Sequence, residues 1–337
     1  MILDADAHVV EPWEMWEEWI TPSMRRQAPR RAMSEEALAW YQESVAASRD
    51  VPSRLRRMDE EGIDASVVLP SQGLVVSAVN DAVLAAAIAD AYNAWVWDYC
   101  GRAPGRLLPA AIIPRQDVRF AVRAVRRAHE TAFDAVLMRP NPVAGRTLDD
   151  QAYDPMWREI EERGLAVLLH EGTGFSPGQT AGIDRYESGI CSHLISHPVE
   201  QMLAVTSFIF GGILARFPRL RVGFLEAGCG WLPYWLDRMD MHCEELSWEV
   251  PWLTMPPSEY FRRQCFVSCE AEDPFIPTVI SHLGHEVLVF STDFPHADHT
   301  MTGAVKTLRA RADIPQPALP GILGDNCMRL LNRGGGQ

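Results

Sequence analysis

The sequence begins "MILDADAHVVEP" (residues 1–12), and this segment separates the two fold classes that the alternation of strands and helices allows. A short apolar run, typical of a buried strand, passes directly into Asp and His side chains. An open doubly wound sheet usually has a glycine-rich phosphate turn after its first strand, and no such turn follows here. A closed barrel, by contrast, assembles its active site from polar residues at strand ends. The segment therefore favours a barrel.

Short apolar runs rich in β-branched residues recur along the rest of the chain, as expected for parallel strands that are buried on both faces. With residues 1–8 they make eight, the others being 65–70, 106–113, 135–138, 165–170, 221–226, 265–268 and 286–291. Long helical stretches lie between them, namely 78–100, 117–130, 151–163, 198–216 and 233–246. Eight strands alternating with helices predict one α/β domain over residues 1–337, a (β/α)₈ TIM-type barrel.

Two stretches exceed what a minimal barrel needs. Residues 9–57, an insertion after the first strand, hold four Trp, and we expect them either to cap the active site or to form a dimer contact. Trp13, Trp16 and Trp19 have the spacing of one helix face, which is typical of a core or an interface. Residues 171–197, rich in Gly, Ser and Thr, are expected to form a loop over the catalytic face.

The composition excludes several classes of function. Forty-five acidic against 31 basic residues give a formal charge of −14, which repels a nucleic-acid backbone, and no basic patch overrides it. The longest apolar runs are shorter than the roughly 20 residues of a membrane-spanning helix. Seven scattered cysteines, and no basic leader followed by an apolar run, predict reduced thiols in the cytoplasm. We therefore expect a small-molecule substrate, with no nucleic-acid or membrane partner.

Polar residues that end the apolar runs are the candidates for a site, because a barrel gathers these strand ends at one mouth. The first strand ends in Asp6 and His8, whose alternation aims both side chains to the same side. The fifth strand ends in His170, the sixth in Glu226, and Asp293 follows the eighth. Two imidazoles and two or three carboxylates from separate strands suit a divalent transition metal. One metal ion per chain is predicted.

Several motifs carry a resemblance to a known family. They are the Asp4-x-Asp6-x-His8 opening, "LLHEG" (168–172), "IFGGILARFPRLRVGFLEAGCGWLPYWLDRMD" (209–240) and "STDFPHAD" (291–298). With these motifs the chain resembles the amidohydrolase superfamily. Within it the chain is similar to the branch that contains aminocarboxymuconate semialdehyde decarboxylase, hydroxybenzoate decarboxylases and many uncharacterised metal-dependent hydrolases. The resemblance runs from residue 1 to "ILGDNCMRLL" (322–331) and implies the barrel fold.

The resemblance also implies a set of metal ligands. The family's His-x-His on strand one, His on strand five and Asp on strand eight carry over to four positions, Asp6, His8, His170 and Asp293. Two positions depart from the pattern, because Asp6 and Glu226 stand where many members have His. The added carboxylates make the site harder and more anionic, which favours Fe²⁺ or Mn²⁺ over Zn²⁺, although Zn²⁺ stays possible.

Other residues near the strand ends are open to two interpretations. Arg139 is placed either to bind an anionic substrate group or to pair with a neighbouring strand-end acid. His296 would touch substrate or bind its own loop, and Trp231 is predicted to contact substrate. His197 precedes Pro198, and we favour a place for it at the start of a helix over a role in the site.

Two reactions fit this site, and a third possibility is a binding protein that has lost catalysis. In hydrolysis of an amide, ester, thioester or C–C bond, a metal-bound water attacks a carbonyl, with Asp293 and Glu226 as the candidate catalytic residues. In non-oxidative decarboxylation, the metal holds an aromatic or unsaturated acid while an acid protonates the carbon that loses CO₂. Glu226 in place of a histidine favours hydrolysis. The resemblance and the Trp-rich insertion together predict a homodimer.

Overall fold

The computed structural model contains an eight-stranded parallel sheet in the order β1 to β8. The strands are β1 (Leu3–Val9), β2 (Ala65–Pro70), β3 (Leu107–Ile112), β4 (Ala135–Met138), β5 (Ala166–Leu169), β6 (Arg221–Phe224), β7 (Cys265–Cys269) and β8 (Leu288–Phe290). Two backbone hydrogen bonds join the segment after β8 to β1, from Asp293 N to Asp6 O at 2.9 Å and from His8 N to Phe294 O at 2.5 Å. The prediction of a (β/α)₈ barrel is confirmed.

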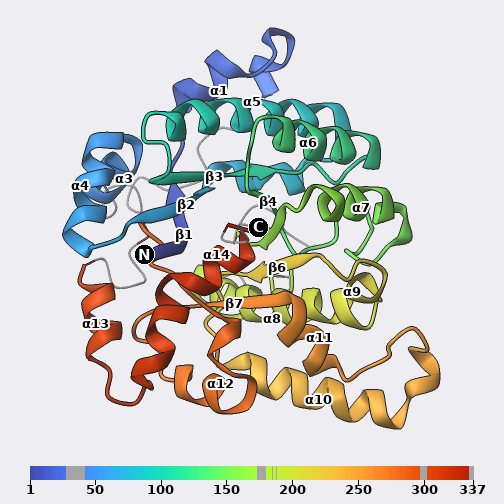
Figure 1. Cartoon of the computed structure of the whole chain (residues 1–337). Helices are drawn as coiled ribbons and strands as arrows, with labels where there is room; N and C mark the ends of the chain where they lie inside the picture. Colours follow the sequence, from blue (N-terminus) through green and yellow to red (C-terminus); the bar gives the residue numbers. More distant parts are fainter. Residues whose placement is uncertain (28–41, 173–179, 184, 187, 297–301, 334–337) are drawn as a thin grey trace.

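The structure describes every residue except 28–41, 173–179, 184, 187, 297–301 and 334–337. The main helices surround the strands (Figure 1). They are α1 (Trp13–Trp19), α3 (Gln42–Arg49), α4 (Val51–Glu61), α5 (Ala82–Gly101), α6 (Val118–Glu130), α7 (Asp154–Arg163), α8 (Gly189–Ile209), α9 (Ile213–Arg216), α10 (Trp231–Glu245), α11 (Pro257–Gln264), α12 (Ile276–Leu283), α13 (Ala304–Ala310) and α14 (Asn326–Leu330).

The strands are short apolar runs whose two faces are both covered. Every residue of β2, "ASVVLP", is buried, and so is every residue of β5, "AVLL". One face packs into the barrel and the other against the helices, so the runs lack the polar alternation of a half-exposed strand. This explains why the apolar runs located all eight strands to within a few residues.

Helix α8 differs from the sequence prediction, which placed a loop up to residue 197 and a helix from 198. The helix begins nine residues earlier, at Gly189, and contains Pro198 in its interior. Proline costs a helix one backbone hydrogen bond and usually marks a boundary. Here Gln201 holds the helix against the barrel, because its Nε2 donates to Leu169 O at 2.9 Å and to Leu225 O at 2.8 Å.

The insertion after β1 is partly a barrel helix. Helix α4 already begins at Val51, and its buried Arg54 donates to His8 O at 2.7 Å and to Ala7 O at 3.3 Å. Within α1, Trp16 is buried and Trp19 is partly exposed. Residues 28–41 of the insertion and parts of the 171–197 segment lie outside the described residues. The roles of the insertion as a cap or a dimer contact stay predictions, as does the single domain.

The C-terminal segment covers the end of the barrel at which the strands begin. Gly324, two residues before α14, lies so close to Met1 that an added Cβ would stand 2.1 Å from the Met1 carbonyl oxygen. In Figure 1, α14 crosses in front of the strands near the centre of the molecule. A site built from the carboxyl ends of the strands therefore lies at the opposite mouth.

Two further observations bear on the cellular setting. Among the described residues, no helix has the length and apolar character to cross a bilayer. All seven cysteines are free. The cytoplasmic location stays a prediction.

Candidate metal centre

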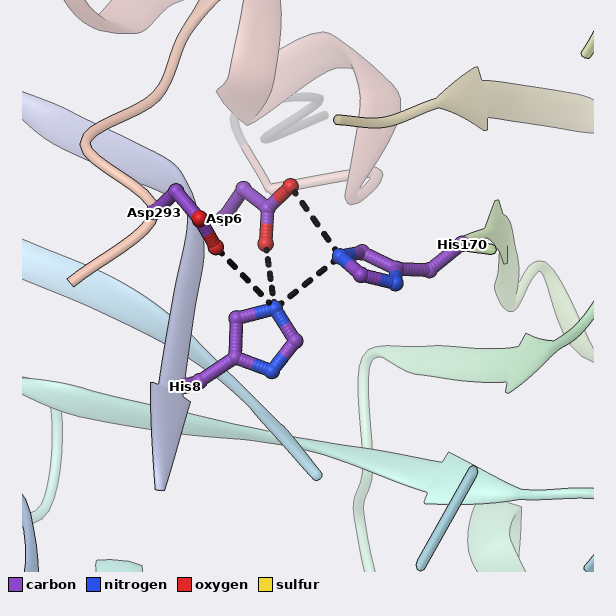
Figure 2. A group of neighbouring side chains, drawn as sticks. All are labelled: Asp6, His8, His170 and Asp293. Carbon is purple, nitrogen blue, oxygen red and sulfur yellow. Dashed lines mark hydrogen bonds and ion pairs between the residues drawn. The ribbon is translucent and has the colours of Figure 1, made fainter. Parts of the chain in front are cut away.

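Four of the predicted site residues meet at the mouth of the barrel (Figure 2). Asp6 and His8 come from β1, His170 directly follows β5, and Asp293 lies three residues after β8. One donor atom from each lies within 4.8 Å of the others, and all four side chains are buried. Asp293 adopts φ 51°, a left-handed conformation unusual for a residue other than glycine, which turns the chain back toward β1.

The two imidazoles face each other through the same nitrogen. His8 Nε2 and His170 Nε2 are 2.9 Å apart, while each Nδ1 faces a backbone carbonyl, that of Pro70 at 2.8 Å and that of Glu171 at 2.5 Å. Because a carbonyl only accepts, each Nδ1 carries a proton and each neutral ring turns its Nε2 lone pair inward. Two lone pairs at this distance repel each other unless a cation or a proton lies between them.

The carboxylate oxygens that surround the two imidazoles also suit a bound cation. Asp6 Oδ1 lies 3.2 Å from His8 Nε2, Asp6 Oδ2 lies 3.7 Å from His170 Nε2, and Asp293 Oδ1 lies 3.4 Å from His8 Nε2. Both oxygens of Asp6 are buried, and neither accepts a hydrogen bond from the described residues. Buried carboxylate oxygens normally have a partner, so this donor set fits a divalent ion and its backbone-anchored imidazoles fit metal ligands.

The two histidines of the centre have pKa values that are shifted in opposite directions. Burial lowers the pKa of His170, but the carboxylates of Asp6 and Glu226 outweigh burial and raise it to about 10. Burial, together with His296 and His170, lowers the pKa of His8 to about 4. Without an ion, one proton on His170 therefore offsets part of the negative charge. An ion that binds here must displace that proton.

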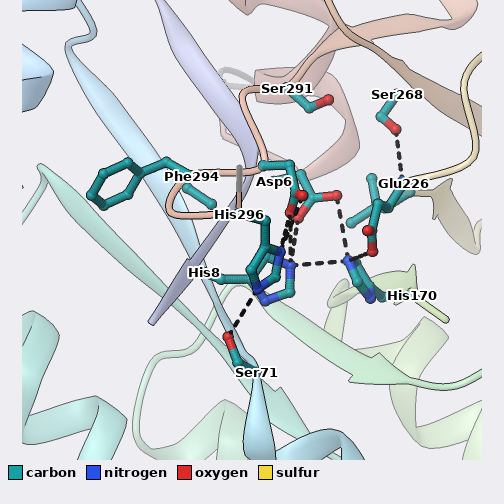
Figure 3. Close-up of polar contacts among 12 residues, drawn as sticks. Asp6, His8, Ser71, His170, Glu226, Ser268, Ser291, Phe294 and His296 are labelled. Carbon is teal, nitrogen blue, oxygen red and sulfur yellow. Dashed lines mark hydrogen bonds and ion pairs between the residues drawn. The ribbon is translucent and has the colours of Figure 1, made fainter. Parts of the chain in front are cut away.

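Glu226 stands beside this centre, two residues after β6 and at φ 48°. Its Oε2 lies 2.8 Å from His170 Nε2, and its backbone N–H donates to Ser268 Oγ at 3.0 Å (Figure 3). Two histidines of α8 approach it from the other side, with His197 Nε2 at 3.3 Å from Oε2 and His193 Nε2 at 3.6 Å from Oε1. His197 therefore lies in the site as well as in a helix. The four-residue spacing of His193 and His197 is typical of one helix face, but the prediction of a loop over residues 171–197 left it unused.

His296 connects Asp293 to the outer part of the mouth. Its Nδ1 lies 2.9 Å from Asp293 Oδ1 and 3.1 Å from Oδ2, and its Nε2 lies 3.4 Å from Ser71 Oγ (Figure 3). The His296 side chain is 22% exposed, whereas that of Asp293 is 1% exposed. The pair can pass a proton between the buried centre and the solvent side.

The other candidates lie farther from this cluster or are already paired. The buried Arg139 forms a salt bridge with Glu171 at 2.5 Å, a strand-end acid that follows His170. Trp231 begins α10, and its indole N–H donates to Gly228 O at 2.9 Å within its own loop. Burial raises the pKa of the Cys229 thiol, which suits a packed residue better than a nucleophile. Substrate contact by Arg139, His296 and Trp231 stays a prediction.

The fold and the site together define a (β/α)₈ barrel with a candidate divalent-metal centre at its mouth. Within that class, the chain belongs to the amidohydrolase family, whose family model matches residues 3–333. It is an enzyme of the amidohydrolase superfamily, as the motifs predicted.

Curated relatives carry more specific names. The chain is 25% identical over 231 residues to 2-amino-3-carboxymuconate-6-semialdehyde decarboxylase from Dictyostelium discoideum, a match that covers 68% of this chain and 62% of that protein. It is 26% identical over 280 residues to gamma-resorcylate decarboxylase from Rhizobium radiobacter, covering 77% of this chain and 82% of that protein. The first match thus spans less than two thirds of its relative.

Solved structures share the fold over nearly the whole chain. An amidohydrolase from Mycobacterium avium subsp. paratuberculosis K-10 has a TM-score of 0.84 at 20% identity, covering 100% of this chain and 98% of that one. A 5-carboxyvanillate decarboxylase from Sphingomonas paucimobilis has a TM-score of 0.79 at 22% identity, covering 98% of each. A 5-carboxyvanillate decarboxylase from Novosphingobium aromaticivorans, solved with manganese and 3-methoxy-4-hydroxy-5-nitrobenzoic acid, has a TM-score of 0.79 at 18% identity, covering 98% and 97%.

These comparisons contradict the prediction of a hydrolase. The curated relatives described above are decarboxylases, which favours the alternative prediction of non-oxidative decarboxylation. The argument for hydrolysis depended on Glu226 replacing an imidazole after strand six. In the structure His193 and His197 bring two imidazoles to Glu226 from α8, so the substitution does not leave this side of the mouth without nitrogen donors.

Proposed function

We propose that this protein is a metal-dependent, non-oxidative decarboxylase of an aromatic or unsaturated carboxylic acid. The observation that carries the proposal is the buried convergence of Asp6, His8, His170 and Asp293 at the mouth of the barrel. The names of the curated relatives support the reaction type, since they act on an unsaturated acid and on a hydroxybenzoate.

Asp6, His8, His170 and Asp293 would hold the ion. When bound there, a divalent ion would supply positive charge that holds a substrate carboxylate or phenolate oxygen. Asp6 and Asp293 add two negative charges to two neutral imidazoles, which favours Mn²⁺ or Fe²⁺ over Zn²⁺. The manganese bound to the structural relative from Novosphingobium supports the same choice.

Asp293 is the proposed proton donor. In its protonated form it would give a proton to the carbon that bears the carboxylate. The bond from that carbon to the carboxylate then breaks, its electron pair stays with the carbon framework, and CO₂ leaves. His296 Nδ1, 2.9 Å from Asp293 Oδ1, would return a proton from the solvent side. The reaction needs no oxidant, because a proton replaces CO₂ on the same carbon.

The buried surroundings suit this step. Asp293 and His8 are nearly inaccessible to solvent, so a proton on Asp293 would pass to the bound substrate or to His296 rather than directly to bulk water. Glu226, whose carboxylate contacts His170, would orient that ring and set the charge of the mouth. Substitution of Asp293 would test the proton transfer, and substitution of Glu226 would separately test the orientation of His170.

A CO₂-release screen tests the proposal. The protein, stripped of metal and reloaded with Mn²⁺ under anaerobic conditions, is mixed with carboxyl-labelled hydroxybenzoic and unsaturated dicarboxylic acids. We expect labelled CO₂ from at least one acid, and none from the metal-free protein or from the Asp6→Ala, His170→Ala double variant. Absence of CO₂ from every acid, at full metal occupancy and with intact folding by circular dichroism, would overturn the proposal.

A further inference from the structure

The second cluster at the mouth consists of His193, His197 and Glu226. Each offers a donor atom, and the three atoms lie within 4.8 Å of one another. The two histidines are four residues apart on α8, so they share one face of the helix, and their ring centroids are 4.0 Å apart. They face different oxygens of one carboxylate, Oε1 for His193 and Oε2 for His197.

The cluster is held in place by contacts on each side. His197 Nδ1 lies 3.2 Å from the carbonyl of His193 and 3.3 Å from Ser196 Oγ, and these contacts hold the ring with its Nε2 toward Glu226. One turn farther along the same helix face, Gln201 bonds to Leu169 O and Leu225 O, the carbonyls that precede His170 and Glu226. The helix face that carries the histidines is thus fastened to the two strand ends beside the first centre.

We propose that this cluster binds a second divalent transition-metal ion, so that the mouth holds a dinuclear centre. Two imidazoles and one carboxylate are a typical donor set for Zn²⁺, Fe²⁺ or Mn²⁺, with further positions open to water or substrate. The Glu226 and His197 side chains are almost fully buried, while the His193 side chain is 44% exposed.

The two centres are adjacent. Glu226 Oε2 lies 2.8 Å from His170 Nε2, a donor of the first centre, and Glu226 also has an oxygen within 4.8 Å of donors on Asp293 and His296. Paired metal ions in enzymes stand about 3.5–4 Å apart and share carboxylate ligands. Glu226 occupies the place of such a shared ligand, between the imidazole of the first centre and those of α8.

A charge argument, which rests on the proposed function, supports the same conclusion. With Asp293 protonated, as the proposed step requires, Asp6 and Glu226 bring two negative charges, so one divalent ion leaves the mouth neutral. A second ion makes the mouth positive, which attracts a carboxylate substrate. Arg139 does not supply this charge, because its guanidinium is paired with Glu171. The geometric argument does not depend on the reaction.

Metal counting together with electron paramagnetic resonance tests the inference. Protein saturated with Mn²⁺ and gel-filtered is expected to retain two ions per chain and to give an exchange-coupled dinuclear signal. The His193→Ala, His197→Ala double variant should retain one ion and give the six-line signal of isolated Mn²⁺. The matched control, His242→Ala with His282→Ala, removes a half-buried and an exposed helical histidine, on α10 and α12, and should retain two ions.

The possible results separate this inference from the proposed function. One ion per chain in the unaltered protein, or two ions that persist in the His193, His197 double variant, would overturn the second site. The count in the unaltered protein decides the question even if a variant fails to fold. If the unaltered protein holds one ion and releases CO₂, the dinuclear centre is wrong and the proposed decarboxylase activity stands. If it holds two ions and releases no CO₂, the dinuclear centre stands and the proposed activity is wrong.

Discussion

At the scale of single residues, Asp293 makes two contacts that suit its two proposed tasks. It lies against His8 in the metal centre and against His296 on the outer side, so one carboxyl group can hold an ion and carry a proton. Its position after the eighth apolar run made it a candidate site residue, and the family resemblance implied that it is a metal ligand. Its contact with His296 became visible only in the structure, where the turn at φ 51° brings the two side chains together.

Asp293→Asn keeps the size of the side chain and one oxygen donor but removes the transferable proton. We expect the metal to be retained and CO₂ release to fall by ~10²-fold or more, the usual scale for a positioned proton-transfer group. Steady-state turnover and metal content, measured on the same sample, check this. Asp237→Asn, which alters an exposed carboxylate of α10, is the control. Near-normal turnover in the Asp293 variant would limit Asp293 to metal binding.

His296→Ala interrupts the proposed proton route without removing a ligand of the first centre. Turnover is expected to fall about 10-fold to 100-fold with the metal content of that centre unchanged, because reprotonation of Asp293 becomes slow. Added imidazole should restore part of the rate by replacing the missing ring. A loss of rate that imidazole does not restore at any concentration would assign His296 to positioning alone.

Metal affinity should depend on pH through His170. Its pKa of about 10 in the metal-free protein means that an ion binding below that pH displaces one proton. Affinity therefore falls about tenfold for each unit that the pH drops below 10. His8, with a pKa of about 4, adds no second proton near neutral pH. Titration calorimetry in buffers of different ionisation enthalpy measures the proton released, and an affinity that does not change with pH would contradict this assignment.

At the scale of secondary-structure elements, the sequence predicted the strands well and one helix poorly. Buried parallel strands are continuous apolar runs, so their ends, and with them Asp6, His8, His170 and Asp293, could be located from the sequence. The start of α8 could not, because Gly, Ser and Pro198 have low helix propensity and the stabilising contact is made by Gln201 with two distant strands. His193 and His197 were for this reason not assigned to the site.

Gln201→Leu tests that contact. Removing the amide takes this donor from the Leu225 carbonyl and leaves the Leu169 carbonyl with the Leu225 N–H, at a cost of roughly 1–3 kcal/mol in the free energy of unfolding. Urea unfolding should show this loss, and metal affinity should fall because both carbonyls precede residues of the centre. Gln151→Leu, at an exposed position of the 3₁₀ segment Gln151–Tyr153, should change neither quantity. Equal stability of the two variants would argue against the role of Gln201.

At the scale of the whole molecule, the assembly state stays a prediction. Several large apolar side chains are exposed on α10 and just after it, among them Tyr234, Met241, Trp248 and Trp252. These side chains offer apolar surface that a second copy could cover. We expect a homodimer by light scattering at micromolar concentration. A monomer under these conditions would contradict the prediction without affecting the reaction.

The account of the whole molecule is most directly tested by the fate of the reacting carbon. The metal-loaded protein is incubated in D₂O with each acid of the CO₂-release screen, and the products are examined by NMR. We expect one deuterium on the carbon that carried the carboxylate, with CO₂ formed in equal amount. A product that keeps its carboxylate and has gained water across a carbonyl bond would contradict it and assign the protein to hydrolysis.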